Sequence, residues 1–402
     1  MTNDLRVLHV IGGLQCGGAE ALLYRLATRK SRVTHEIVSL GKRDWYSPLL
    51  EQHGIEVHHF NIESLRSALG ALRGLEQLIA RSGADVIQSW MYMSNVVAGV
   101  LARPHIPVVW GIHTSTFDGT GLSSRIAARI GGACAPQLSD FVINCSSRSA
   151  EMHARLGYSR VPGAVIHNGY DPCAFFPDED IRSAVRAQLD VADDCFVIGC
   201  VARWNAQKDI PNLLAAMSDG KRAGLPFIYV LAGRGLDWQN RELVRCLNDS
   251  QCVDIVCLLG ERSDIPDLMR AFDLHVLPSC GGEAFPNAVA ESMLSATPNV
   301  VTDTGDAATI VGDAGWVVQP RDSKGLAHAM RDAFNEYRNN PFEWQQRRMA
   351  ARARVAERYT FESMAEAYEN VWRQAVLNAR RSYKRKRQGS DEAVAAIDHD
   401  VR

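Results

Sequence analysis

The stretch EAFPNAVAE contains the residues of this sequence most suited to binding a reactive ligand. It begins with the carboxylate of Glu283 and ends with that of Glu291. The stretch follows a strand-like run and opens a predicted helix, and Pro286 suits the first helical turn because its missing N–H would be unpaired there anyway. Backbone N–H groups near Phe285 and Asn287 are then free to face an anion. Glu291 is expected roughly 7.5 Å further along the helix axis, too far for a simple acid–base pair. The two carboxylates could hold two ends of one extended ligand, although two unrelated surface residues would give the same spacing.

A pair of cations forms the second candidate, in the run VARWNAQKD (201–209). The run begins where the first strand of the second half of the chain ends, which is where open α/β sheets bind ligands. Arg203 offers a planar fork of donors and Lys208 a point charge, and both suit phosphates. Two solvated surface cations are the alternative.

A glycine-rich turn, GGLQCGGAE (Gly12–Glu20), lies between the first predicted strand and the first predicted helix. Glycines let the backbone approach a ligand closely, and a helix N-terminus favours negative charge. The pattern is not GxGxxG, and the next strand, HEIVSL, lacks a terminal acid for a ribose, so a dinucleotide site is not favoured. A tight turn without a ligand is the alternative.

Histidines and acidic triplets give weak signals. His113 ends a predicted strand and could donate to a sugar hydroxyl, although a lone histidine is more often structural. His58 and His59 look like strand residues, and the triplets 178–180 and 398–400 look like solvated charge. Ten cysteines are scattered without a CxxC pair, which is typical of reduced thiols. We therefore expect no metal and no cofactor.

The elements that must position these residues form two series. Short β-branched runs alternate with amphipathic stretches through the first half, and the pattern restarts at CFVIGCVA (195–202) after a turn-rich joint. Strands alternating with helices imply parallel sheets covered on both faces. The sequence predicts an α/β fold of two Rossmann-like domains that face a central cleft. The predicted parts are residues 1–175, residues 176–358, a helix over 359–387 and a disordered tail over 388–402.

Overall charge excludes some classes of protein. The 402 residues carry 44 basic and 46 acidic side chains, a net charge of −2, which argues against nucleic-acid binding through whole-surface charge. There is no run of about eighteen apolar residues that could span a membrane, and the start resembles no signal peptide. We therefore expect a cytoplasmic protein. The basic run 380–387 would either touch anionic lipid as a peripheral contact or be a solvated helix end.

Taken together, these motifs resemble a known family, the GT-B retaining glycosyltransferases of the family 4 type (glycosyl transferases group 1). The element from Glu283 to Glu291 is the family's most specific mark. Further support comes from five runs in the expected order: IHNGYDPCAFFP, VARWNAQKD, VLAGRG, LLGERSDIPDLMRAFDLHVLPS and DTGDAATIVGDAGWVV. The resemblance covers nearly the whole chain and implies a C-terminal helix that crosses back to the first domain.

The resemblance implies roles for the charged residues. Glu283 would contact hydroxyls of a donor sugar, and Glu291 would accept hydrogen bonds from the ribose. Arg203 and Lys208 would neutralise the diphosphate as it leaves, without a metal. Such a site fits a reaction whose charge builds on the departing diphosphate, because fixed positive partners then favour the transition state.

The resemblance implies further donor contacts. Gly13 would help to hold phosphate, His113 would meet the far hydroxyls of the sugar, and Arg262 would grip the nucleobase. A backbone loop would contact the sugar and the diphosphate; its residues are Ala284, Phe285, Pro286 and Asn287.

The implied function is transfer of a sugar from a nucleotide-sugar donor to a carbohydrate or lipid-linked carbohydrate acceptor, in cell-surface polysaccharide or glycoconjugate biosynthesis. A GT-B-fold sugar-nucleotide epimerase and a non-catalytic sugar-nucleotide-binding protein are the alternatives. The chain departs from the family at two places: Ala284 replaces a usual glycine, and Leu294-Ser295-Ala296 replaces Ala-Cys-Gly. Ala284 would be strained if the backbone there is left-handed, and both departures concern local loop geometry.

Overall fold

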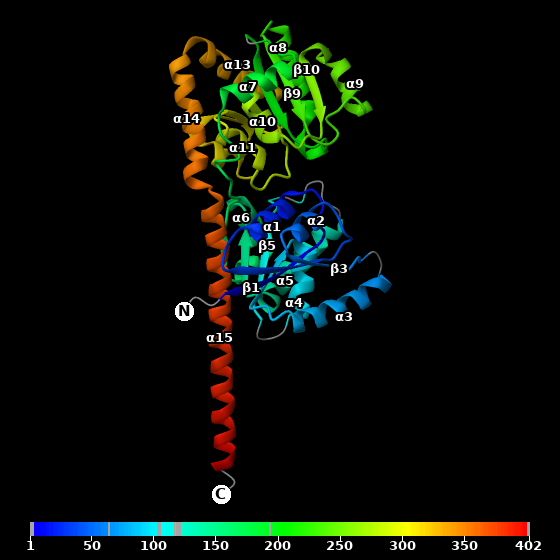
Figure 1. Cartoon of the computed structure of the whole chain (residues 1–402), viewed down its shortest axis with the longest axis vertical. Helices are drawn as coiled ribbons and strands as arrows, with labels where there is room; N and C mark the ends of the chain where they lie inside the picture. The colour runs from blue at the N-terminus through cyan, green and yellow to red at the C-terminus, as the bar shows by residue number, and fades with distance from the viewer. Residues whose placement is uncertain are drawn as a thin grey trace. The chain divides into compact units, whose positions relative to one another are not determined.

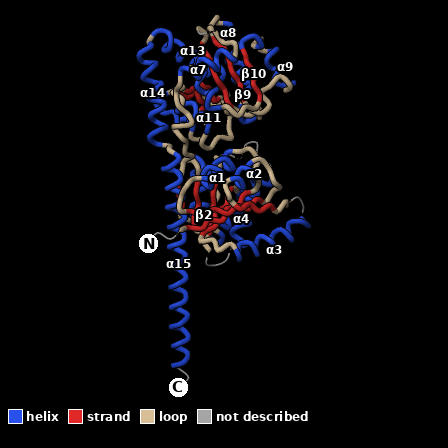
Figure 2. Tube along the Cα trace, viewed as in Figure 1, coloured by secondary structure: helices blue, strands red, loops and turns tan. Residues whose placement is uncertain are grey.

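The computed structural model describes residues 4–62, 65–102, 106–115, 117, 122–192 and 194–399. The chain divides into two compact units. Unit 1 comprises residues 1–113, 121–166 and 365–402, and unit 2 comprises residues 114–120 and 167–364. The chain thus passes from one unit to the other at 166/167, nine residues before the boundary expected from the sequence. Figure 2 shows the strands in red and the helices that flank them in blue.

Within the described residues, unit 1 is built on a seven-stranded parallel sheet with the order β3-β2-β1-β4-β5-β6-β7. Its strands are β1 (Leu5–Ile11), β2 (Val33–Ser39), β3 (Glu56–His59), β4 (Val86–Trp90), β5 (Val108–Ile112), β6 (Phe141–Asn144) and β7 (Gly163–Val165). Its helices are α1 (Gly18–Thr28), α2 (Tyr46–Gln52), α3 (Leu65–Arg81), α4 (Tyr92–Leu101), α5 (Leu122–Leu138) and α6 (Ser147–Ala154).

Unit 2 repeats this design with a six-stranded parallel sheet, in the part of the chain that is described, of order β10-β9-β8-β11-β12-β13. Its strands are β8 (Phe196–Val201), β9 (Phe227–Ala232), β10 (Val256–Gly260), β11 (Leu274–Leu277), β12 (Asn299–Thr302) and β13 (Trp316–Val318). Its helices are α7 (Glu179–Gln188), α8 (Ile210–Arg222), α9 (Arg241–Asp249), α10 (Ile265–Ala271), α11 (Asn287–Leu294), α12 (Ala307–Val311), α13 (Ser323–Asn339) and α14 (Pro341–Arg358). The two predicted Rossmann-like folds are confirmed.

The sheets form where the sequence places continuous apolar runs. In β8, the residues from Phe196 to Cys200 are all buried, as expected for a strand covered on both faces. Glycine at position 199 is required there, because a Cβ would overlap the ring of Phe272. Burial of such runs on both faces of each sheet provides the main stabilisation.

The last helix, α15 (Phe361–His399), joins unit 1 from residue 365 onward and is drawn in orange and red in Figure 1. Its predicted apolar face is confirmed: Tyr368 and Trp372 are fully buried. The indole N–H of Trp372 donates to the Gln88 side chain at 2.8 Å, and Glu369 pairs with Arg29 at 2.8 Å. These contacts fix the helix to unit 1.

The helix continues beyond the expected end. Residues 388–399 are helical, so the prediction of a disordered tail is wrong for them, and 400–402 lie outside the described residues. The segment contains three alanines and Glu392, which have good helix propensity, and it extends a helix that is already nucleated. Among the described residues, no helix is both long and apolar enough to cross a membrane.

Candidate functional site

The candidate site of unit 2 lies where its strand order reverses. The chain builds outward from β8 in one direction to β9 and β10, and in the other to β11, β12 and β13. Ligands of open α/β sheets bind at the carboxyl ends of the strands flanking such a switch point. The turn 202–209 follows β8 and the loop 278–286 follows β11, so the fold brings together two stretches that are far apart in the sequence.

A charged pair occupies this switch point. The ammonium of Lys208 donates to Oε1 of Glu283, and Ser279 donates to the same oxygen at 2.5 Å. Glu283 is only 6% exposed, so its charge requires these partners. Lys208 is held by its own turn, where its backbone N–H donates to the Asn205 side chain at 3.0 Å. Lys208 and Glu283, which the sequence put forward as separate candidates, are therefore in direct contact.

A glycine, Gly305, packs closely against the backbone of the loop that carries Glu283. Gly305 has φ of +55°, and a Cβ there would lie 2.6 Å from the backbone oxygen of Glu283. Next to it, the N–H of Asp306 donates to the Ala284 oxygen at 2.8 Å. The loop is therefore fixed through its carbonyl groups, which leaves its side chains and N–H groups for other contacts.

The two departures from the family differ in their consequences. Ala284 does not have a left-handed backbone, so alanine is compatible with that position. Ala296, by contrast, has φ of +58° just after the end of α11, where helices commonly place glycine. The strained residue is thus Ala296, after the end of α11, and not Ala284 in the loop 278–286.

Helix α11 begins at Asn287, with Pro286 at the cap instead of the first turn as expected. The side-chain oxygen of Asn287 accepts from Asn168 at 2.9 Å and from the hydroxyl of Tyr170 at 2.7 Å. These bonds orient the amide N–H₂ of Asn287 away from the two donors. The preceding Phe285 is buried, with its ring centroid 4.9 Å from that of His167.

Three other predicted residues differ in exposure and in their partners. Arg203 is exposed and makes no hydrogen bond within the described residues, which leaves its fork available. Glu291 is half-buried in the second turn of α11. Arg262 follows β10, two strands from β8, and its guanidinium binds both carboxylate oxygens of Asp264, which lowers the pKa of that carboxyl. A ligand would have to compete with Asp264 for Arg262.

The equivalent turn of unit 1 has a different character. Gly12 and Gly13 line a cavity of about 330 Å³ together with Gly41. A Cβ at Gly13 would meet nothing within 4 Å. At the start of α1, a Cβ at Gly17 would overlap a carboxylate oxygen of Glu20. The carboxylate of Glu20 thus lies near this helix N-terminus.

His113 lies at the end of β5, as predicted from the sequence. Its ring stacks on Trp90 with centroids 5.2 Å apart, and burial lowers its pKa to about 4. The imidazole is therefore neutral at pH 7. Its Nε2 is buried and has no partner among the residues described.

Sequence reasoning missed two residues that hold the site. Ser279 ends the run before the Gly-Gly turn, and nothing in its local pattern separates it from an ordinary turn serine. Gly305 lies in DTGDAATIVGDAGWVV, a run that supported the family resemblance without a role of its own. Gly305 could have been noticed because it comes directly before Asp306, where a helix starts.

Comparison with known families covers both units. Residues 16–173 match the family described as Glycosyltransferase Family 4, and residues 195–336 match Glycosyl transferases group 1. EpsF of Bacillus subtilis is 27% identical over 323 residues, which span 75% of this chain and 80% of EpsF. The lipopolysaccharide core biosynthesis mannosyltransferase LpsB of Rhizobium meliloti is 30% identical over 199 residues, 47% of this chain and 54% of LpsB.

Solved structures agree with the fold. Alr3699/HepE of Anabaena, in complex with UDP-glucose, superposes with a TM-score of 0.79 at 22% identity, covering 92% of this chain and 100% of that one. At this identity the likeness shows the fold alone.

Proposed function

Because the chain belongs to the GT-B glycosyltransferases of group 1 and family 4, we propose that it transfers a sugar from a nucleotide-sugar donor with retention of configuration. The observation that carries this proposal is the contact between Lys208 and Glu283 at the unit 2 switch point. UDP-glucose in the Anabaena protein supports a nucleotide-sugar donor.

The charged pair provides one binding group for the diphosphate of the donor and one for its sugar. In the ligand-free site, Lys208 and Glu283 satisfy each other. A diphosphate would take over the ammonium of Lys208, and Glu283 would then accept hydrogen bonds from sugar hydroxyls. Ser279 keeps the carboxylate in place during this exchange. One ion pair is thus replaced by two sets of charge-assisted contacts with the donor.

Charge on the departing diphosphate is stabilised by fixed groups in this proposal. Lys208 and the exposed Arg203 supply positive charge, and the N–H groups at the start of α11 supply dipoles. Transfer then proceeds without a metal. Retention follows if the acceptor attacks from the side that the leaving group occupies, with the acceptor proton passing to the diphosphate, so no protein nucleophile is required.

The acceptor is a carbohydrate or a lipid-linked carbohydrate, and the pathway is the synthesis of a cell-surface polysaccharide or glycoconjugate. The role of the Rhizobium relative in lipopolysaccharide core biosynthesis supports this part of the proposal. No contact described in the site specifically favours the two alternatives, an epimerase or a non-catalytic binding protein.

A panel of UDP-, GDP- and ADP-sugars tests the proposal by thermal shift, with and without Mg²⁺. We expect one nucleotide series to raise the unfolding midpoint equally in both conditions. The Lys208→Met variant should lose most of this shift, while the matched Lys221→Met variant, changed at a half-buried lysine of α8 that pairs with Asp254, should keep it. Stabilisation that requires Mg²⁺ would contradict metal independence, and equal shifts in both variants would contradict the site.

We further propose a peripheral contact of the run 380–387 with anionic lipid at the cytoplasmic face. Arg380 is exposed and pairs with Asp85 at 3.2 Å, and the side chains beyond Arg381 lie outside the described residues. Co-sedimentation with phosphatidylserine vesicles should decrease when the basic residues of this run become glutamine. Unchanged sedimentation would identify the run as a solvated helix end.

A further inference from the structure

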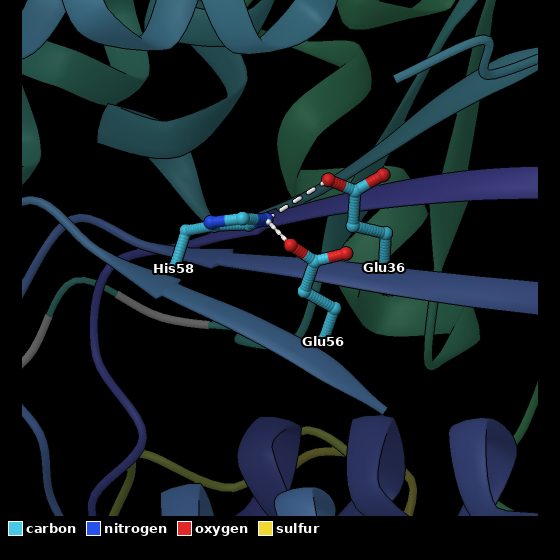
Figure 3. A group of neighbouring side chains, drawn as sticks. All are labelled: Glu36, Glu56 and His58. Atoms are coloured by element: carbon cyan, nitrogen blue, oxygen red, sulfur yellow. Dashed lines mark hydrogen bonds and ion pairs between the residues drawn. The ribbon is translucent and has the colours of Figure 1, made fainter. Parts of the chain in front are cut away.

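Three potential metal ligands converge on one face of the sheet of unit 1. Glu36 belongs to β2, and Glu56 and His58 belong to β3. Figure 3 shows both carboxylates pointing to the same imidazole nitrogen. Nε2 of His58 lies 2.9 Å from Oε1 of Glu36 and 3.3 Å from Oε1 of Glu56. One ligand atom from each residue lies within 4.8 Å of the other two.

The backbone fixes this arrangement. Glu36 is opposite Glu56 in the parallel register, and His58 is two residues further along β3, so all three side chains share one face of the sheet. Because β2 is paired on both sides, its position is rigid; β3 is a short strand at the edge of the sheet and is held by β2 alone. The three ligands therefore connect an edge strand to the body of the sheet.

The local charge is not balanced by the protein. Both carboxylates pair with His58, and neither pairs with a lysine or arginine among the described residues. With a neutral imidazole the group carries two negative charges, and with a protonated imidazole it still carries one. A divalent cation would neutralise the group completely, whereas a histidine alone cannot.

We propose that Glu36, Glu56 and His58 bind a Zn²⁺ ion that links β3 to β2. Zinc accepts imidazole nitrogen and carboxylate oxygen at about 2.0–2.2 Å in tetrahedral geometry, which places neighbouring ligand atoms roughly 3.4 Å apart. The observed separations of 2.9 and 3.3 Å are close to this value, so small side-chain shifts would suffice. A water molecule would complete the fourth position, and the ion would be structural, separate from sugar transfer.

Zinc binding by the full-length chain tests the proposal. The chain is first stripped with a chelator, and bound Zn²⁺ per chain is then measured by equilibrium dialysis for wild type, His58→Gln, Glu36→Gln and a control, His328→Gln. The control removes an exposed histidine in α13 of unit 2. Cysteine thiols bind zinc equally in all four proteins, so the differences between them report the histidine and carboxylate ligands.

We expect wild type and His328→Gln to bind one more ion than His58→Gln and Glu36→Gln. Crystals soaked with Zn²⁺ should show an anomalous peak at the zinc edge about 2.0–2.1 Å from Nε2 of His58. The His58→Gln variant should still transfer sugar at the wild-type rate, so the outcome is independent of the proposed function. Equal zinc content in wild type and His58→Gln, or anomalous signal confined to cysteines, would overturn the proposal.

Discussion

The two switch points of the molecule share a strand order and differ in their contents. In unit 2, the turn after β8 and the loop after β11 meet in an ion pair that Ser279 also contacts. In unit 1, the corresponding turn after β1 leaves a cavity of about 330 Å³ lined partly by Gly12 and Gly13. One fold therefore provides a site of fixed charges in one unit and a site of accessible backbone in the other.

This difference indicates a division of labour. Fixed charges in partly buried surroundings stabilise charge that develops during a reaction, because they need no reorganisation at that moment. A glycine-lined turn offers only N–H groups and space, which suits contact with one end of a ligand. The chemistry is thus expected to depend on unit 2, and unit 1 is expected to contribute mainly to positioning.

Acid should affect the two units unequally. Burial lowers the pKa of His35 and His153 in unit 1 to about 4 and that of His9 well below its ordinary value, while in unit 2 burial lowers the pKa of His275 to about 4. An unfolded histidine titrates near 6.5, so the stability gained from burying the neutral rings is complete above that pH and is lost as pH falls toward 4. At pH 5, each of these buried histidines should lower the free energy of unfolding by about 2 kcal/mol relative to pH 7.

Hydrogen exchange at pH 7 and pH 5 measures this difference by peptide. Peptides of β1 and β2 should lose more protection than those of β11 and β12. Equal loss of protection in both units would show that the buried histidines do not determine acid stability.

Two glycine-to-alanine substitutions distinguish a glycine needed for stability from one needed for the approach of a ligand. Gly305→Ala should lower the unfolding free energy by about 2 kcal/mol and impair transfer, because its Cβ would overlap the Glu283 backbone at a left-handed φ. Gly13→Ala should leave stability unchanged, since its Cβ meets no protein atom within 4 Å. Denaturant unfolding and a transfer assay give both readouts. Full activity of Gly13→Ala would exclude close approach of a ligand to that residue.

The smallest expected effect is a gain in stability. Ala296→Gly should raise the unfolding free energy by about 1 kcal/mol, because it removes the cost of a left-handed alanine after α11. Transfer should remain at the wild-type rate. A loss of stability in denaturant unfolding would mean that the buried methyl group contributes more than the backbone strain costs.

The sequence predicted the fold well because its main signals are local. Apolar runs such as CFVIGCVA report strands buried on both faces, and their alternation with helices indicates parallel sheets. The end of α15 was misjudged because Gly389, Ser390 and Asp391 favour ending a helix, whereas a helix that is already nucleated can extend through them.

The site was predicted in part. Lys208 and Glu283 were identified because cations and acids at strand ends are visible in the sequence. Ser279 and Gly305 were missed because their importance depends on contacts with Glu283, which only the fold creates. Arg262 was assigned to a ligand, and its pairing with Asp264, two residues away, could not be judged without geometry.

The rate of sugar transfer by Lys208→Met, compared with Lys221→Met, tests the central claim most directly. Both variants lose one lysine of unit 2, but only Lys208 contacts Glu283. Using the donor selected by thermal shift, at a temperature where both variants are folded, we predict that kcat falls by at least about 100-fold for Lys208→Met and is unchanged for Lys221→Met. Wild-type turnover by folded Lys208→Met would contradict the assignment of this switch point as the donor diphosphate site.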